Sequence, residues 1–150
     1  TPDAIYERPG NMFVAAFLGN PSINFLPGEL MQEGDRLLFR RGALRLELST
    51  EMAGRLAGQA GRAVVMGLRA EDVEMGDGTA GKDSLNGRIL SVLPVGSDQF
   101  LELEVEGTKV FLRVGKEGQY RVDENASLKV NLNRLHLFDQ STTQNLMGHG

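Results

Sequence analysis

The chain contains no cysteine among its 150 residues, and this absence removes two kinds of scaffold. Disulfide frameworks need cysteine pairs and many structural zinc sites use thiolate ligands, so a packed core must hold the fold instead. The absence is compatible with a reducing compartment such as the cytosol. Long hydrophobic runs are missing as well. No apolar stretch approaches the roughly 20 residues that cross a bilayer, and no basic-then-apolar signal opens the sequence.

Tryptophan is absent and basic charge is in the minority, which argues against nucleic acid as a partner. Sixteen Lys and Arg residues face twenty Asp and Glu residues, for a net charge of −4, so the chain has no general attraction for polyanions. Two tyrosines and seven phenylalanines leave few side chains on which bases can stack once a core is filled. The hydrophobic share of 41% is sufficient for one globular domain, and we expect its core to be subdivided.

The first twenty residues predict two short helices. Thr1 and Pro2 fit the start of one helix, and Pro9 ends it. Asn11 and Gly19 bound the second. Every residue from 12 to 18 is apolar, so this second helix has no polar face and must be buried against another surface.

From residue 22 onward the pattern changes to a period of two, with a glycine about every ten residues, as in small β-barrels and sandwiches. The sequence therefore predicts a mainly β domain. Besides two hairpins, alternating and continuous apolar runs predict strands over residues 24–31, 63–68, 87–95 and 127–132. One helical turn is expected over residues 51–56, although Gly54 and Gly58 weaken it.

The clearest unit is a hairpin whose expected two-residue turn, Gly107-Thr108, is of type II′. This turn pairs Val105 with Val110, Leu103 with Leu112, Leu101 with Val114, Glu102 with Arg113 and Glu106 with Lys109. A second hairpin turns at Arg41-Gly42 and pairs Phe39 with Leu44, Leu37 with Leu46 and Arg36 with Glu47. Both registers place the apolar side chains of a hairpin on one face.

Three patterns resemble catalytic or ligand-binding motifs, and each has a simpler interpretation. Residues 76–83 nearly form a phosphate-binding loop, but Asp83 stands where a hydroxyl ligand for Mg²⁺ is needed. His136 precedes Asp139 by three residues, yet a histidine without a second ligand or a nucleophile is usually packed or at the surface. Alternating carboxylates on the outward face of the first hairpin are interpreted as solvation, namely Glu102, Glu104 and Glu106. We assign no catalytic, cofactor-binding or metal-binding residue.

Five segments stand in an order that identifies a family. They are residues 5–19 with the run Phe13-Val14-Ala15-Ala16-Phe17-Leu18-Gly19, then Asn24-Phe25-Leu26, then Gly67-Leu68-Arg69-Ala70-Glu71-Asp72, then Val95-Gly96-Ser97-Asp98, and last His136-Leu137-Phe138-Asp139. Together they resemble the C-terminal part of the ATPase subunit of carbohydrate-type ABC importers, the maltose and glycerol-phosphate group. The third segment departs from that family's Gly-Ile-Arg-Pro-Glu-His signature. Ala70 replaces the proline and Asp72 the histidine, so the turn after Arg69 is less rigid and its charge is altered.

The resemblance implies that residues 1–20 are the helical tail of a nucleotide-binding domain that precedes them, and that residues 21–150 form an OB-like β-barrel regulatory domain, often called TOBE. It implies that this chain is not itself an enzyme, and that ATP and Mg²⁺ bind the preceding domain. The implied partners are a second copy of the chain, its own nucleotide-binding domain, transmembrane permease subunits and, in some members, a regulatory protein. The implied location is cytoplasmic, peripheral on the inner membrane.

The same segments supply candidate site residues, which we interpret as structural or interface positions. Arg69 and Glu71 can pair to fix the corner after a buried strand. Gly96 is expected to supply a backbone conformation that other residues resist, and Ser97 with Asp98 a turn hydrogen bond. The remaining candidates are Asn24, Phe25, Leu26, Gly67, Phe138 and Asp139. The alternative from a different class is an OB-like module that binds a small ligand, an oxyanion or an oligonucleotide.

Overall fold

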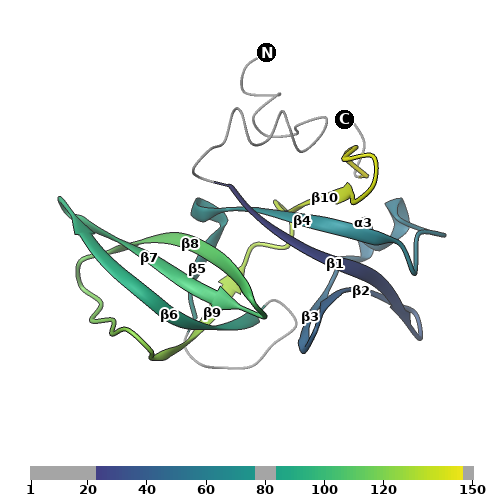
Figure 1. Cartoon of the computed structure of the whole chain (residues 1–150). Helices are drawn as coiled ribbons and strands as arrows, with labels where there is room; N and C mark the ends of the chain where they lie inside the picture. The colour runs from purple at the N-terminus through teal and green to yellow at the C-terminus, as the bar shows by residue number, and fades with distance from the viewer. Residues whose placement is uncertain (1–22, 77–83, 147–150) are drawn as a thin grey trace, which may run out of the picture.

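The computed structural model describes residues 23–76 and 84–146, which form two antiparallel five-stranded sheets (Figure 1). The first sheet has the order β10-β4-β1-β2-β3, with β1 at Ile23–Glu33, β2 at Arg36–Arg41, β3 at Leu44–Glu47, β4 at Ala63–Arg69 and β10 at His136–Asp139. The second has the order β5-β9-β6-β7-β8, with β5 at Val73–Met75, β6 at Ser84–Val95, β7 at Asp98–Val105, β8 at Thr108–Gly115 and β9 at Asn125–Val130. The prediction of a mainly β domain is confirmed.

Helical structure in the described residues is limited to two short elements. The helix α3, Thr50–Arg55, confirms the helical turn expected there, and the 3-10 turn η1, Ala70–Asp72, joins β4 to β5. Ser49 begins α3 because its hydroxyl accepts a hydrogen bond from the backbone N–H of Met52 at 3.2 Å. The two predicted N-terminal helices and most of the phosphate-loop-like segment lie outside the described residues.

Both sheets contribute to one continuous apolar core. The inward residues of β4 are Val64, Met66 and Leu68, and those of β7 are Leu101, Leu103 and Val105, all essentially inaccessible to solvent. The second sheet curls until its two edge strands, β5 and β8, contact each other, which makes a half-closed barrel (Figure 1). Since one core spans both sheets, we treat the described residues as a single packed unit.

The hairpin of β7 and β8 has a different register from the one expected. Its turn is Glu106-Gly107, with φ of 47° and 80°, and positive φ at both positions is the mark of type I′. Leu103 therefore pairs with Val110, Leu101 with Leu112, Glu104 with Lys109 and Phe100 with Arg113. The predicted pairings were wrong by two residues. A slip of two preserves which side chains face the core, so the inward set was correct.

The hairpin of β2 and β3 shows the same kind of slip. Its turn is Gly42-Ala43, and only Gly42 has positive φ, at 57°. Phe39 consequently pairs with Leu46 rather than with Leu44. The residue opposite Glu47 is Leu38, so the predicted position of Arg36 was wrong, although the two charged side chains still approach to 3.8 Å.

A β-bulge at Leu90 changes the face of the sheet to which β6 presents its apolar residues. Ile89 pairs with Leu103, but the next pairs are Ser91 with Glu102 and Val92 with Leu101. Because one residue is inserted, Ile89 and Val92 both belong to the core side. The residues beyond the bulge, Leu93 and Val95, point to the outer face instead.

Candidate functional site

Asn24 joins the two sheets through its carboxamide. Its side chain is only 4% exposed, and it donates from Nδ2 to the backbone oxygen of Phe111 at 2.9 Å while accepting from the backbone N–H of Phe111 at 2.8 Å. Phe111 lies on β8, an edge strand of the second sheet, so its outward backbone groups need a partner. The candidate residue Asn24 therefore completes an edge of the β8 strand, a structural role.

A second link between the sheets comes from Arg41. Its Nη1 donates to the backbone oxygen of Pro27 at 2.9 Å, and its Nε donates to the backbone oxygen of Glu106 at 3.1 Å. The turn of the β7–β8 hairpin is thereby held against the first sheet. Sequence reasoning did not find this contact, because an arginine beside a glycine turn carries no signal of a distant partner.

Phe25, Gly67 and Phe138 meet on the face of the first sheet opposite the core. Phe25 and Phe138 pack edge to face with ring centroids 6.2 Å apart. A β-carbon at Gly67 would lie 3.0 Å from Cε2 of Phe138 and 3.5 Å from Cβ of His136, so the absence of a side chain makes room for the ring. Leu26 points the other way and belongs to the core.

The corner after β4 gathers buried charge. Arg69 is 2% exposed, whereas Glu71 is exposed, and the expected Arg69–Glu71 pair stays a prediction. The ion pair found at this corner joins Nε of Arg134 to Oδ1 of Asp72 at 3.0 Å. Burial raises the pKa of the Asp72 carboxyl and Glu71 adds to the rise, while Arg134 and Arg69 oppose it. In the sequence, the one indication of the Arg134–Asp72 ion pair was that Asp72 stands where the family signature has histidine.

Asp139 closes the first sheet with a turn that it caps. Its Oδ1 accepts hydrogen bonds from the backbone N–H groups of Ser141 at 2.8 Å and Thr142 at 2.7 Å. Its Oδ2 lies 3.0 Å from Nε of Arg62. The hydrogen bond from Thr142 leads the interactions that lower the pKa of Asp139, with further contributions from Ser141 and Arg62. The geometry is that of a turn anchor.

Gly96, Ser97 and Asp98 form the tip of the β6–β7 hairpin. Gly96 has φ of 60°, as its expected role requires. The Asp98 carboxylate binds an arginine across the sheet rather than the turn backbone, since its Oδ2 accepts from Nε of Arg113 at 2.6 Å. Apart from Leu26 in the core, the candidate residues thus occupy five separate places and do not converge on one site.

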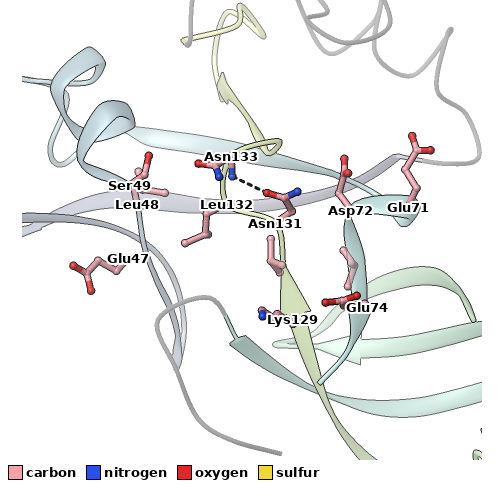
Figure 2. Close-up of a pocket in the computed structure, with 12 residues that line it drawn as sticks. Glu47, Leu48, Ser49, Glu71, Asp72, Glu74, Lys129, Asn131, Leu132 and Asn133 are labelled. Carbon is pink, nitrogen blue, oxygen red and sulfur yellow. Dashed lines mark hydrogen bonds between the residues drawn. The ribbon is translucent and has the colours of Figure 1, made fainter. Parts of the chain in front are cut away.

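A pocket of about 500 Å³ lies at the corner that carries Glu71 and Asp72, and its volume is in the range of small-ligand sites. Its lining combines four carboxylates with one lysine and several carboxamides and apolar groups: Glu47, Leu48, Ser49, Glu71, Asp72, Val73, Glu74, Lys129, Val130, Asn131, Leu132 and Asn133. Figure 2 shows Glu47 and Ser49 on one side, the acidic residues of η1 and β5 on the other, and Asn131 between them, bonded by the backbone N–H of Asn133 at 3.1 Å.

The chemistry of this pocket is that of a polar crevice. Four carboxylates against one ammonium give its lining a negative surplus, which disfavours an oxyanion. Across residues 23–76 and 84–146, no group of three or more His, Asp or Glu side chains is placed to hold a metal ion. Within the same ranges, no helix has the length and apolar character needed to cross a membrane.

Two family models match adjoining parts of the chain. The MalK OB fold domain matches residues 19–73, and the TOBE domain matches residues 66–138. They overlap over the end of β4 and η1, where the chain passes from the first sheet to the second.

Curated relatives align over almost the whole chain. The ABC transporter ATP-binding protein YcjV of Escherichia coli O157:H7 is 30% identical over 143 residues, covering 94% of this chain and 38% of the relative. The xylose/arabinose import ATP-binding protein XacK of Haloferax volcanii is 30% identical over 146 residues, covering 95% of this chain and 37% of the relative. The chain therefore spans less than two fifths of the length of these relatives.

Among solved structures, the cytoplasmic molybdate-binding protein ModG with molybdate bound superposes with a TM-score of 0.57. The match covers 76% of this chain and 94% of that protein at 21% identity, so it supports the fold alone. Because both family models match in order and the aligned relatives are ABC transporter ATP-binding proteins, the chain belongs to the family of MalK-type OB-fold and TOBE domains of these proteins.

Proposed function

We propose that this chain is the regulatory and dimerisation domain of the ATP-binding subunit of a sugar ABC importer, and that it does not hydrolyse ATP by itself. The observation that carries the proposal is the tandem match to the MalK OB fold and TOBE domains within one packed core. Relatives named for xylose/arabinose and sulfoquinovosyl glycerol transport support a sugar as the cargo of the whole protein. Nucleotide and Mg²⁺ are assigned to a preceding domain.

The mechanism rests on effective concentration. Two regulatory domains that stay in contact keep two ATPase domains close, so ATP needs only to drive their closure and not their assembly. Such a scaffold has to be rigid, and the links of Asn24 to Phe111 and of Arg41 to Glu106 tie the two sheets into one body. A regulatory protein that binds better to the open arrangement inhibits by shifting the population toward it. Transmembrane permease subunits complete the assembly at the cytoplasmic face of the membrane.

Sedimentation equilibrium of the 150-residue chain tests the dimerisation. We expect a reversible monomer–dimer equilibrium described by a single constant, together with no ATP hydrolysis above background. A strict monomer at concentrations well above micromolar contradicts the proposal. Open-ended association without a dimer plateau contradicts it as well, because a two-fold contact closes after two copies.

The pocket of Figure 2 favours a second candidate function, a small-ligand module. Thermal unfolding in the presence of molybdate or of simple sugars separates the two, because a ligand that binds only the folded state raises the midpoint. The acidic lining leads us to expect no rise with molybdate. A rise with any of these ligands moves the assignment toward the ligand-binding module.

A further inference from the structure

The outer face of the second sheet carries an apolar surface that the fold does not use. Beyond the bulge at Leu90, Leu93 pairs with Phe100, and Val95 pairs with Asp98. Phe111 lies on the same face of the neighbouring strand, because it pairs with Glu102, two residues from Phe100. We call Leu93, Val95, Phe100 and Phe111 the hairpin patch.

The hairpin patch is open to solvent. Its members are exposed by 59%, 47%, 41% and 44% respectively. Figure 1 shows the tip of β6 and β7 pointing away from the first sheet, so the rest of the described chain leaves this end uncovered. Without the bulge, the alternation of β6 would turn Leu93 and Val95 toward the core side. A β-bulge that turns two apolar side chains outward to solvent is typical of an interaction surface.

We propose that the hairpin patch is the surface through which two copies of this chain pair. The proposal rests on the proposed dimerisation function and deepens it by naming the face. With roughly 150–200 Å² of accessible surface per residue of these types, the patch exposes on the order of 350 Å². Two copies then bury about 700 Å² from these residues alone. A stable interface of roughly 1,200–2,000 Å² therefore also requires about 500 Å² or more from the polar residues around the patch.

The centre of the patch is held in place before any partner arrives. The guanidinium of Arg113 lies 5.7 Å from the centroid of the Phe100 ring. That guanidinium is itself fixed, because its Nε and Nη2 lie 2.6 and 2.5 Å from Oδ2 of Asp98. A ring that packs against a fixed cation loses little freedom on binding, which favours Phe100 as an anchor.

The charges around the patch disfavour strongly charged occupants and are compatible with a second copy of the same surface. Asp98 is paired with Arg113, and Lys109 lies 3.7 Å from Glu102, so the rim carries two opposite-sign pairs and no local surplus. An anionic membrane needs a basic surplus, and a strongly charged protein partner needs the opposite sign. A rim that carries both signs and no net charge meets its two-fold copy without net like-charge repulsion.

The test compares two matched variants of the full chain by sedimentation equilibrium. The double variant Leu93→Ser with Phe100→Ser removes two apolar side chains of the patch from each copy, so a two-fold dimer loses four. We expect its dimer dissociation constant to rise by roughly 100-fold or more, as for two interface hot spots. The control is Val122→Ser, which changes a residue that is 55% exposed but lies in the segment between β8 and β9, outside the patch. We expect it to leave the constant within about threefold of the original.

The outcomes separate this inference from the function on which it rests. If the original chain and the double variant dimerise equally well, the hairpin patch is not the dimer interface, although dimerisation itself is supported. A monomeric original chain overturns both. Cross-linking supplies a readout that does not depend on the double variant folding. Since the chain has no cysteine, Leu93→Cys with a short bis-maleimide is expected to give a covalent dimer, and Val122→Cys is not. Equal cross-linking of both variants contradicts the assignment.

Discussion

Replacing Asn24 by alanine removes the carboxamide that holds the edge of β8 against the first sheet. Two hydrogen bonds to Phe111 are lost together, and each normally contributes about 0.5–1.5 kcal/mol net. The truncated site is buried, so the freed N–H and C=O groups of Phe111 are imperfectly hydrated, which adds to the loss. We expect Asn24→Ala to lower the free energy of unfolding by about 2–3 kcal/mol, or the midpoint of thermal unfolding by roughly 5–10 °C.

Urea unfolding of Asn24→Ala beside Asn86→Ala measures this effect. Asn86 is an exposed asparagine on β6, and its replacement should change stability by less than about 0.5 kcal/mol. A loss at Asn24 no larger than at Asn86 refutes the idea that the carboxamide couples the sheets. Asn24→Asp sharpens the test. Its carboxylate keeps the acceptor for Phe111 but loses the donor, and burial raises its pKa, so its stability should recover as the pH falls and the acid becomes a donor.

Further predictions concern four positions that the structure explains individually. Gly67→Ala should lower the free energy of unfolding by about 1–2 kcal/mol, because the new methyl group would press on Phe138. Gly54→Ala in α3 should raise it by about 0.5–1 kcal/mol, because nothing lies within 4 Å of the added β-carbon and alanine favours a helix. The midpoints of urea unfolding test both predictions. Asp139→Ala should destabilise at neutral pH. Since the folded pKa of Asp139 lies below its ordinary value, the difference should persist above the unfolded pKa and shrink as the pH falls through the folded pKa; a pH-independent difference contradicts this. Glu106→Asn should raise the thermal midpoint, because asparagine tolerates the φ of 47° better than glutamate; an unchanged or lower midpoint would show that no strain is relieved.

Local pattern determined the faces of the strands but not their registers. The continuous apolar run before Arg69 predicted β4, and alternation around Leu103 predicted the inward side of β7. Alternation has a period of two, so it does not distinguish a turn at Glu106-Gly107 from one at Gly107-Thr108. Propensity favoured glycine in the first turn position, whereas the structure places glutamate there with positive φ. The backbone oxygen of that glutamate accepts from Arg41, a tertiary contact that supports the observed turn.

The contacts that unite the two sheets were beyond the reach of sequence patterns. Asn24 and Phe111 are 87 positions apart, and Arg41 and Glu106 are 65 apart. A hydropathy pattern does not predict that a carboxamide will form hydrogen bonds with the edge of a strand far away in the sequence. The family segments nevertheless marked Asn24 as a candidate, so resemblance located the residue while the structure supplied its physical role.

The position of β10 in the first sheet has a consequence for how the protein is made. β1 to β4 leave the ribosome early, yet the edge of β4 from Val64 to Gly67 has its hydrogen-bonding partner only in β10, at His136–Asp139. At roughly 5–20 residues per second, that edge waits several seconds for about seventy more residues to be synthesised. During this interval β4, six of whose seven residues are buried in the folded domain, presents an open edge, so nascent chains translated close together on one messenger are prone to pair there before the domain closes.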